Sequence, residues 1–139
     1  MKQAIAMTLL LATIALAQKS PTVSLIALIA SPERYDGKQV VVSGYMYLQR
    51  ERSALYLAKA DFQHALFKDA FYLEVPNQMG ERIYRLNGCY VEITGTFDGK
   101  HTGHMGAFSG ELIVKEVSPI WTGTVPADLK DSSNPVSCK

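Results

Sequence analysis

The sequence is short of cysteine, of net charge and of long apolar runs. Its 139 residues include two cysteines, 14 Lys plus Arg and 13 Asp plus Glu. Charges this evenly balanced give no global positive field of the kind that supplies most nucleic-acid affinity, although a local basic patch could survive. Two cysteines far apart in the chain do not make a thiolate metal site. The length suits one domain.

The long apolar run that does occur lies at the N-terminus. Lys2 precedes an apolar stretch at 4–17 that ends in the letters ALA. A positive start, an apolar segment and a small-x-small end are typical of a secretory signal peptide. A membrane anchor is the alternative, but a spanning helix needs about 20 apolar residues. We predict cleavage between Ala17 and Gln18, no membrane span after cleavage, and a periplasmic or secreted protein.

Export would place Cys89 and Cys138 in an oxidising compartment, where disulfides form and persist. A bond between them is therefore predicted. It would close a loop of about 50 residues and contribute about 3–4 kcal/mol by the chain-entropy model. The alternative is that Cys89 is a buried thiol and that Cys138 is free.

Five segments alternate apolar and polar residues, as strands with one buried face do. They are 39–48, 54–58, 70–75, 89–97 and a final strand that begins at Phe108 and runs through Leu112 and Val114. Within the first segment, Gly44 marks a bulge or sharp bend. A short helix is expected within 23–30, and an irregular or one-turn helical crossing over 81–86.

This pattern predicts a mainly β fold, a five-stranded OB-like Greek-key barrel with a short N-terminal helix and an extended C-terminal tail. A five-stranded α+β sheet or another small barrel is the alternative. The barrel domain is expected to span 22–118 and the tail 119–139, anchored where Trp121 or Cys138 holds it.

Three stretches carry a resemblance to known proteins. They are SLIALIASPERYDGKQVVVSGY at 24–45, SALYL at 53–57 and YVEITGTFDGKHTGHMGAFSGEL at 90–112. Together they resemble a family of small secreted bacterial OB-like proteins of unknown function, and GHMG is the most specific part. The resemblance implies the fold and export. It supplies no activity and no catalytic residue.

The glycine-rich stretch 94–110 is predicted to join the last two strands. In OB barrels this connection often binds ligands. His104, Met105 and Phe108 are therefore ligand-binding candidates. The alternative is that the glycines serve turn geometry and that these three side chains fix the loop.

Two histidines of this loop, His101 and His104, form an H-x-x-H pair and are weak metal candidates. A metal site would need a third ligand such as Asp98, His64 or Glu111. The alternative is that His104 packs against the loop while His101 is solvated. We predict no cofactor.

Tyrosines form the second candidate set. Alternation places Tyr45, Tyr47, Tyr56 and Tyr72 on the face opposite the aliphatic residues. An aromatic outer face of an OB barrel can stack bases or sugars, so Tyr45, Tyr56 and Tyr72 are ligand-binding candidates. The alternative is that they cover the sheet beneath the N-terminal helix or at an interface.

No catalytic arrangement is recognisable in the sequence. Ser109 lies in GAFSGE, which is not the G-x-S-x-G elbow, and the carboxylates are scattered. We therefore predict an exported, non-enzymatic OB-like binding or interaction module, whose partner is an envelope protein or a small ligand rather than nucleic acid. The alternatives are a metal- or small-ligand-binding envelope protein that uses the 95–110 loop, and a hydrolase with an unrecognised site.

Overall fold

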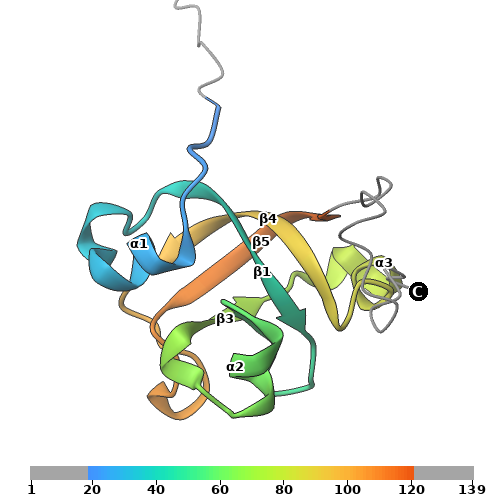
Figure 1. The fold of residues 1–139 in the computed structure, drawn as a ribbon. Coiled ribbons are helices and arrows are strands. Elements are labelled where there is room, and N and C mark those ends of the chain that lie inside the picture. Colours follow the sequence, from blue (N-terminus) through green and yellow to red (C-terminus); the bar gives the residue numbers. More distant parts are fainter. Residues whose placement is uncertain (1–18, 121–139) are drawn as a thin grey trace, which may run out of the picture.

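A computed structural model describes residues 19–120, which form a closed five-stranded barrel (Figure 1). The strands are β1 (Gln39–Tyr47), β2 (Ala54–Tyr56), β3 (Ala70–Glu74), β4 (Cys89–Asp98) and β5 (Glu111–Pro119). Their order around the barrel is β1-β2-β3-β5-β4, and β1 pairs with β4 to close it. The β3–β5 pair is parallel and the others are antiparallel. The predicted mainly β, OB-like barrel is confirmed.

Short helices lie at separate places around the barrel (Figure 1). They are α1 (Leu25–Ala30), α2 (Lys59–Gln63) and α3 (Gly80–Tyr84), with single 3₁₀ turns at Pro32–Arg34, Phe67–Asp69, Asn77–Met79 and His104–Gly106. The Ser24 hydroxyl caps α1 by accepting a hydrogen bond from the Ala27 N–H at 3.1 Å. The helix ends before Pro32, since the residue preceding a proline disfavours helical backbone.

The barrel interior is aliphatic and aromatic. Leu25 and Leu28 of α1 join it, together with side chains from all five strands. A Cβ added at Gly44 would lie 2.5 Å from the Tyr56 carbonyl oxygen and 3.0 Å from the Leu25 side chain. The absence of a side chain at Gly44 therefore lets α1 and β2 approach β1 closely, where β1 pairs with strands on both sides.

A second, smaller apolar cluster lies on the outside of β1, β2 and β3. Its buried members are Tyr45, Ala54, Tyr56, Ala70 and Phe108. The segment between β2 and β3, which contains α2, packs over this face through Phe62 and Phe67. The outer face of β1 and β2 is thus covered by an insert of the barrel itself.

Two details of the expected strands are wrong. The second strand was expected to span 54–58, but β2 ends at Tyr56, and Leu57 is 41% exposed. The last strand begins at Glu111, because Phe108 belongs to the preceding loop and packs outside the barrel.

Several predictions fall wholly or partly outside the described residues: the signal peptide at 1–17, Trp121, Cys138 and nearly all of the 119–139 tail. Cys89 is buried at the start of β4, and its bond to Cys138 stays a prediction. Within 19–120, no helix is long and apolar enough to cross a bilayer.

Candidate functional site: a pocket between two loops at one end of the barrel

A pocket of about 510 Å³ opens between the β1–β2 loop, the β4–β5 loop and Tyr72 in the middle of β3. Its lining residues are Arg50, Glu51, Tyr72, Lys100, His101, Thr102, Gly103, His104 and Glu111. The volume lies in the range of small-molecule sites. In OB barrels the same two loops and the neighbouring strand face form the ligand-binding surface.

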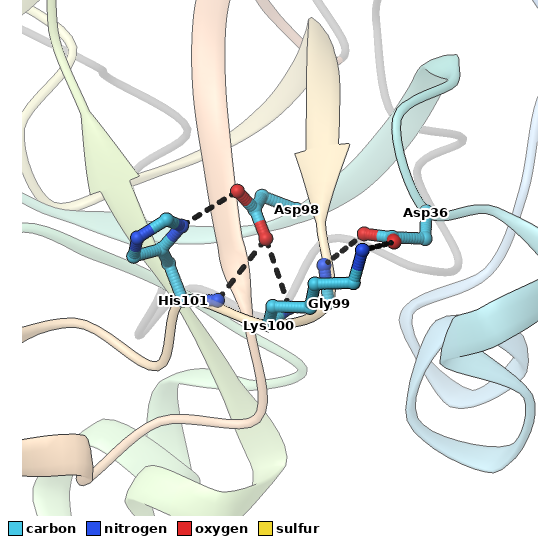
Figure 2. Close-up of polar contacts among 5 residues, drawn as sticks. All are labelled: Asp36, Asp98, Gly99, Lys100 and His101. Carbon is cyan, nitrogen blue, oxygen red and sulfur yellow. Dashed lines mark hydrogen bonds and ion pairs between the residues drawn. The ribbon is translucent and has the colours of Figure 1, made fainter.

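The start of the β4–β5 loop is fixed by Asp36, which lies in the turn before β1 (Figure 2). Its carboxylate accepts a hydrogen bond from the Gly99 N–H at 3.0 Å and contacts the Lys100 ammonium at 3.1 Å. The Gly99 N–H and then Lys100 lower the pKa of Asp36. Because Gly37 also donates to the Phe97 carbonyl at 2.8 Å, this turn and the end of β4 form one hydrogen-bonded unit.

The next residues of the loop are ordered by Asp98 (Figure 2). One carboxylate oxygen accepts from the backbone N–H groups of Lys100 and His101, at 2.8 and 3.1 Å, and the other lies 2.6 Å from Nδ1 of His101. These hydrogen bonds, led by that of His101, hold the pKa of Asp98 at about 2. The hydrogen bond with Asp98 also raises the pKa of His101.

The middle of the loop lies directly against β3. A Cβ on Gly103, whose φ is +65°, would lie 2.6 Å from Cβ of Tyr72. The Phe108 N–H donates to the Thr102 carbonyl at 3.1 Å and closes this part of the loop on itself. Glycine at 103 is therefore required both by the backbone conformation and by the contact with Tyr72.

The end of the loop is bound to the insert between β2 and β3. Lys68 donates to the Gly106 carbonyl at 3.1 Å, and the Ser109 hydroxyl donates to the Lys68 carbonyl at 2.6 Å. Ala65 and Met105 are the two non-glycine residues with positive φ among residues 19–120, one in each segment. Met105 is 88% exposed. The loop thus has bound ends and a strained, exposed tip.

Carboxyl groups also line the pocket. Glu111 opens β5 beside Tyr72 of β3 and Asp98 of β4. Burial, followed by a hydrogen bond with Glu74, raises the pKa of Glu111. A carboxyl group with a raised pKa spends more time protonated, and it can then both donate and accept hydrogen bonds.

The structure separates the three predicted loop residues. His104 lines the pocket, and Met105 is exposed at the tip. Phe108 is 1% exposed and contacts the rings of Phe67 and Tyr72, with centroids 5.5 and 5.8 Å away. Phe108 is therefore a packing residue that holds the loop on the barrel, which its expected place at the start of a strand did not indicate.

The predicted tyrosines are separated too. Tyr45 and Tyr56 are 5% and 2% exposed and pack around Phe62. Burial raises the pKa of both phenols. Tyr72 is half-buried and lines the pocket. Ligand contact is therefore open to Tyr72 and closed to the other two, and the cover is the α2 insert rather than the N-terminal helix.

The metal candidates do not converge. The structure shows no group of three or more His, Cys, Asp or Glu residues that could hold a metal ion, as far as residues 19–120 are concerned. His101 is engaged with Asp98, whereas His64 lies at the end of α2 in the insert. In the H-x-x-H sequence, the imidazole of His101 is thus paired with a carboxylate of the protein itself.

Sequence reasoning did not single out Arg50, Glu51, Lys100 and Thr102, which line the pocket, or Asp36, which fixes its loop. The first two belong to the β1–β2 loop, which reads in the sequence as an ordinary polar hairpin turn. Asp36 lies 63 positions from the amide that it binds. The expected OB strand order could have pointed to the β1–β2 loop, because it brings the β1–β2 and β4–β5 loops to the same end of a barrel.

A second groove, of about 620 Å³, lies between α3 and β5. Apolar residues such as Ile83 and Val117 line it together with Arg82, Arg85 and Lys115. It shares no lining residue with the pocket between the loops. It therefore provides positions for control substitutions.

The fold and pocket define this chain as an OB-like barrel with a pocket between its β1–β2 and β4–β5 loops. No family model and no curated protein matches the chain. Among solved structures, it is similar to asparaginyl-tRNA synthetase from Pyrococcus horikoshii, with 17% identity over 63% of this chain and a TM-score of 0.42. It is also similar to a putative aspartyl-tRNA synthetase from Leishmania major, with 13% identity over 82% of this chain and a TM-score of 0.49.

The chain spans only 20% and 23% of the lengths of these two proteins. At these identities and TM-scores, the similarity carries no information about what this chain binds.

Proposed function

We propose that this protein is an exported OB-like binding module that holds a small polar ligand in the pocket between its β1–β2 and β4–β5 loops. The observation that carries the proposal is the pocket itself, because it coincides with the ligand-binding end of OB barrels. A closed barrel has no free sheet edge, so the loops at its ends are the natural recognition elements.

The rigidity of the pocket wall supports binding. Asp36 and Asp98 fix the first residues of the β4–β5 loop, while Lys68 and Ser109 fix its end. A wall that is ordered before binding loses little conformational entropy when a ligand arrives. The loop's hydrogen bonds thus favour recognition by a preformed site.

The pairing of charged groups favours binding over catalysis. Lys100 is paired with Asp36, and His101 with Asp98, within the protein. A general base must be free to take up a proton at working pH, whereas the Asp98 carboxylate holds its hydrogen bonds and has a pKa of about 2. Asp98 is therefore poorly suited to transfer protons.

The proposal is tested by mapping ligands onto ¹⁵N-labelled protein by NMR. The panel contains neutral and acidic oligosaccharides, mononucleotides, an oligothymidylate, short peptides and divalent zinc. Binding at the pocket should shift amide signals of residues 50–51, 72, 100–104 and 111. Arg50→Ala should weaken it, and Lys115→Ala in the second groove should not.

If every ligand that binds shifts only the 78–86 and 115–119 signals, or if no panel member shifts the pocket signals, the proposal is wrong. Export has its own test, the intact mass of protein produced in a bacterium with its own N-terminal segment. Loss of residues 1–17 and recovery outside the cytoplasm are expected. A full-length mass in the cytoplasmic fraction would refute export.

A further inference from the structure

The pocket also carries information about the class of ligand. One aromatic side chain, Tyr72, lines it, and that ring is held from behind by Phe108. Tyr45 and Tyr56, which would extend the aromatic surface along the barrel, are covered by Phe62. Single-stranded nucleic acids are held by a series of aromatic rings, one for each successive base. A pocket with one aromatic side chain is therefore better matched to a ligand that places a single ring in it than to a strand of successive bases.

Two basic side chains, Arg50 and Lys100, and the imidazole of His101 line the same space. Lys100 also contacts Asp36, and His101 contacts Asp98. The Arg50 guanidinium can grip a carboxylate with two parallel N–H bonds. His101 binds Asp98 through Nδ1, so Nε2 is the ring nitrogen left for a ligand. Hydrogen bonding to Asp98 raises the pKa of His101, which favours a donor at this position. These groups predict that the ligand carries an anionic group.

Two carboxyl groups, Glu51 and Glu111, line the same pocket. Glu74 and Asp98 lie next to Glu111. The hydroxyl groups of a ligand can hydrogen-bond to such carboxyl groups, whether these are ionised or protonated.

Together, one aromatic ring, basic groups and hydroxyl-binding carboxyl groups match a pyranose ring that bears a carboxylate. The weakly positive C–H groups of such a ring are attracted to the negative face of an aromatic side chain. We propose that the pocket binds a glycan containing carboxylated sugar residues. Its Arg50, Lys100 and His101 would receive the carboxylate, Glu51 and Glu111 the hydroxyls, and Tyr72 the ring. This inference rests on the proposed binding function of the same pocket.

Two sources share this chemistry, namely polysaccharides of uronic acids and cell-wall glycans whose amino sugars carry a lactyl carboxylate. The experiment uses isothermal titration calorimetry with a galacturonic-acid hexamer and with an N-acetylglucosamine–N-acetylmuramic-acid disaccharide. The methyl ester of the hexamer is the matched control, because it keeps the rings and removes the charge. A neutral maltohexaose and an octamer of thymidylate complete the set.

We expect at least one acidic glycan to bind, and the source that binds identifies the ligand. Esterification of the hexamer, if that is the ligand, should weaken binding tenfold or more, because a charge-assisted bidentate contact is lost. Arg50→Ala should have a similar effect, and Arg50→Lys should restore only part of the affinity. Tyr72→Ala should weaken binding while Tyr72→Phe keeps it. Lys115→Ala should bind as the wild type does.

Other outcomes separate this inference from the proposed function. If maltohexaose or the ester binds as tightly as the acidic hexamer, the pocket binds sugars and the role of the carboxylate is wrong. If the thymidylate octamer binds more tightly than every glycan and loses affinity in Arg50→Ala, the pocket function stands and the glycan class is wrong. If neither acidic glycan binds, the glycan inference is refuted, and the NMR panel alone decides whether the pocket binds anything.

Discussion

Two halves of the same outer barrel face differ in whether another segment of the protein covers them. On one half, Tyr45 and Tyr56 lie beneath Phe62 of the α2 insert and are almost completely buried. On the other half, Tyr72 lies against the β4–β5 loop and lines an open pocket. The three tyrosines come from neighbouring strands and point to the same side of the sheet.

The difference shows that a strand's alternation decides which face a side chain is on, and that other segments decide whether that face is covered. The insert between β2 and β3 supplies Phe62, whose ring stacks on Tyr47 with centroids 4.0 Å apart. On the pocket half, the β4–β5 loop passes beside Tyr72 at Gly103, which has no side chain to cover the tyrosine. A ligand can therefore reach Tyr72, whereas Tyr45 and Tyr56 are covered.

The largest expected effect concerns Phe108, which joins the two halves. Phe108→Ala should lower the free energy of unfolding by about 3–5 kcal/mol, because a fully buried ring is removed from between Phe67 and Tyr72. Urea denaturation measures the change. Met105→Ala, on the exposed tip of the same loop, is the control and should change the free energy by less than about 0.5 kcal/mol. A loss below about 1 kcal/mol for Phe108→Ala would show that the loop is not packed on β3.

The next effect tests the covered half directly. Phe62→Ala should lower the free energy of unfolding by about 2 kcal/mol, because a half-buried ring loses its contacts with three tyrosines. The pKa values of Tyr45 and Tyr56, which burial raises, should fall toward 10 in the variant. Ultraviolet titration of the phenols measures this shift.

Leu66→Ala is the matched control for the insert, because Leu66 is 44% exposed and close to Phe62 in sequence. It should leave both the stability and the phenol titration nearly unchanged. Unchanged phenol pKa values in Phe62→Ala would mean that other groups bury these tyrosines, and the contrast between the two halves would then have another cause.

The smallest effect concerns the Asp98–His101 pair at the open half. Asp98 has a pKa of about 2, below its ordinary 3.8, so its contribution to stability is present above about pH 4 and is lost as the pH falls through about 2. The pKa of His101 is raised above 6.5, so its contribution is present below about pH 6.5 and is lost as the pH rises through the raised value. Asp98→Asn should therefore destabilise the protein most between about pH 4 and 6.5.

Thermal denaturation of the wild type and Asp98→Asn across this range measures the difference. NMR titration should also show the pKa of His101 falling toward 6.5 in the variant, although nearby Glu111 and Glu74 still raise it. His64→Gln serves as the control, because His64 is exposed in the insert. A destabilisation that does not change with pH would assign the effect to the backbone hydrogen bonds of Asp98 rather than to its pairing with His101.

Much of the barrel could be predicted from the sequence because strands with one buried face carry their own pattern. Val40, Val42 and Met46 are spaced by even numbers of residues and so lie on one face of a strand, and the structure buries all three in the core. Gly44, in the same strand, marks a place where neighbouring segments approach closely. The errors lie at strand ends. Leu57 and Phe108 are apolar residues within the predicted strand segments, but the structure places both of them outside the strands.

The candidate site was less predictable because its walls are distant in sequence. The glycine-rich loop was expected to be the connection with a role in binding, and His104 does line the pocket. Arg50 carries no signal of its own in a polar turn. The resemblance to small secreted OB-like proteins, the export and the Cys89–Cys138 bond remain predictions that the experiments above or a thiol count under oxidising conditions can test.

By itself, the sequence determined the number and faces of the strands, since a period of two is written into each segment by local residue choice. It also determined the glycines that the β4–β5 loop needs, because positive φ is a local requirement. Only the tertiary structure decided that Phe62 covers Tyr45 and Tyr56 while Tyr72 stays at a pocket. The physical reason is that cover depends on contacts between segments far apart in the chain, and a local pattern does not encode which segments meet.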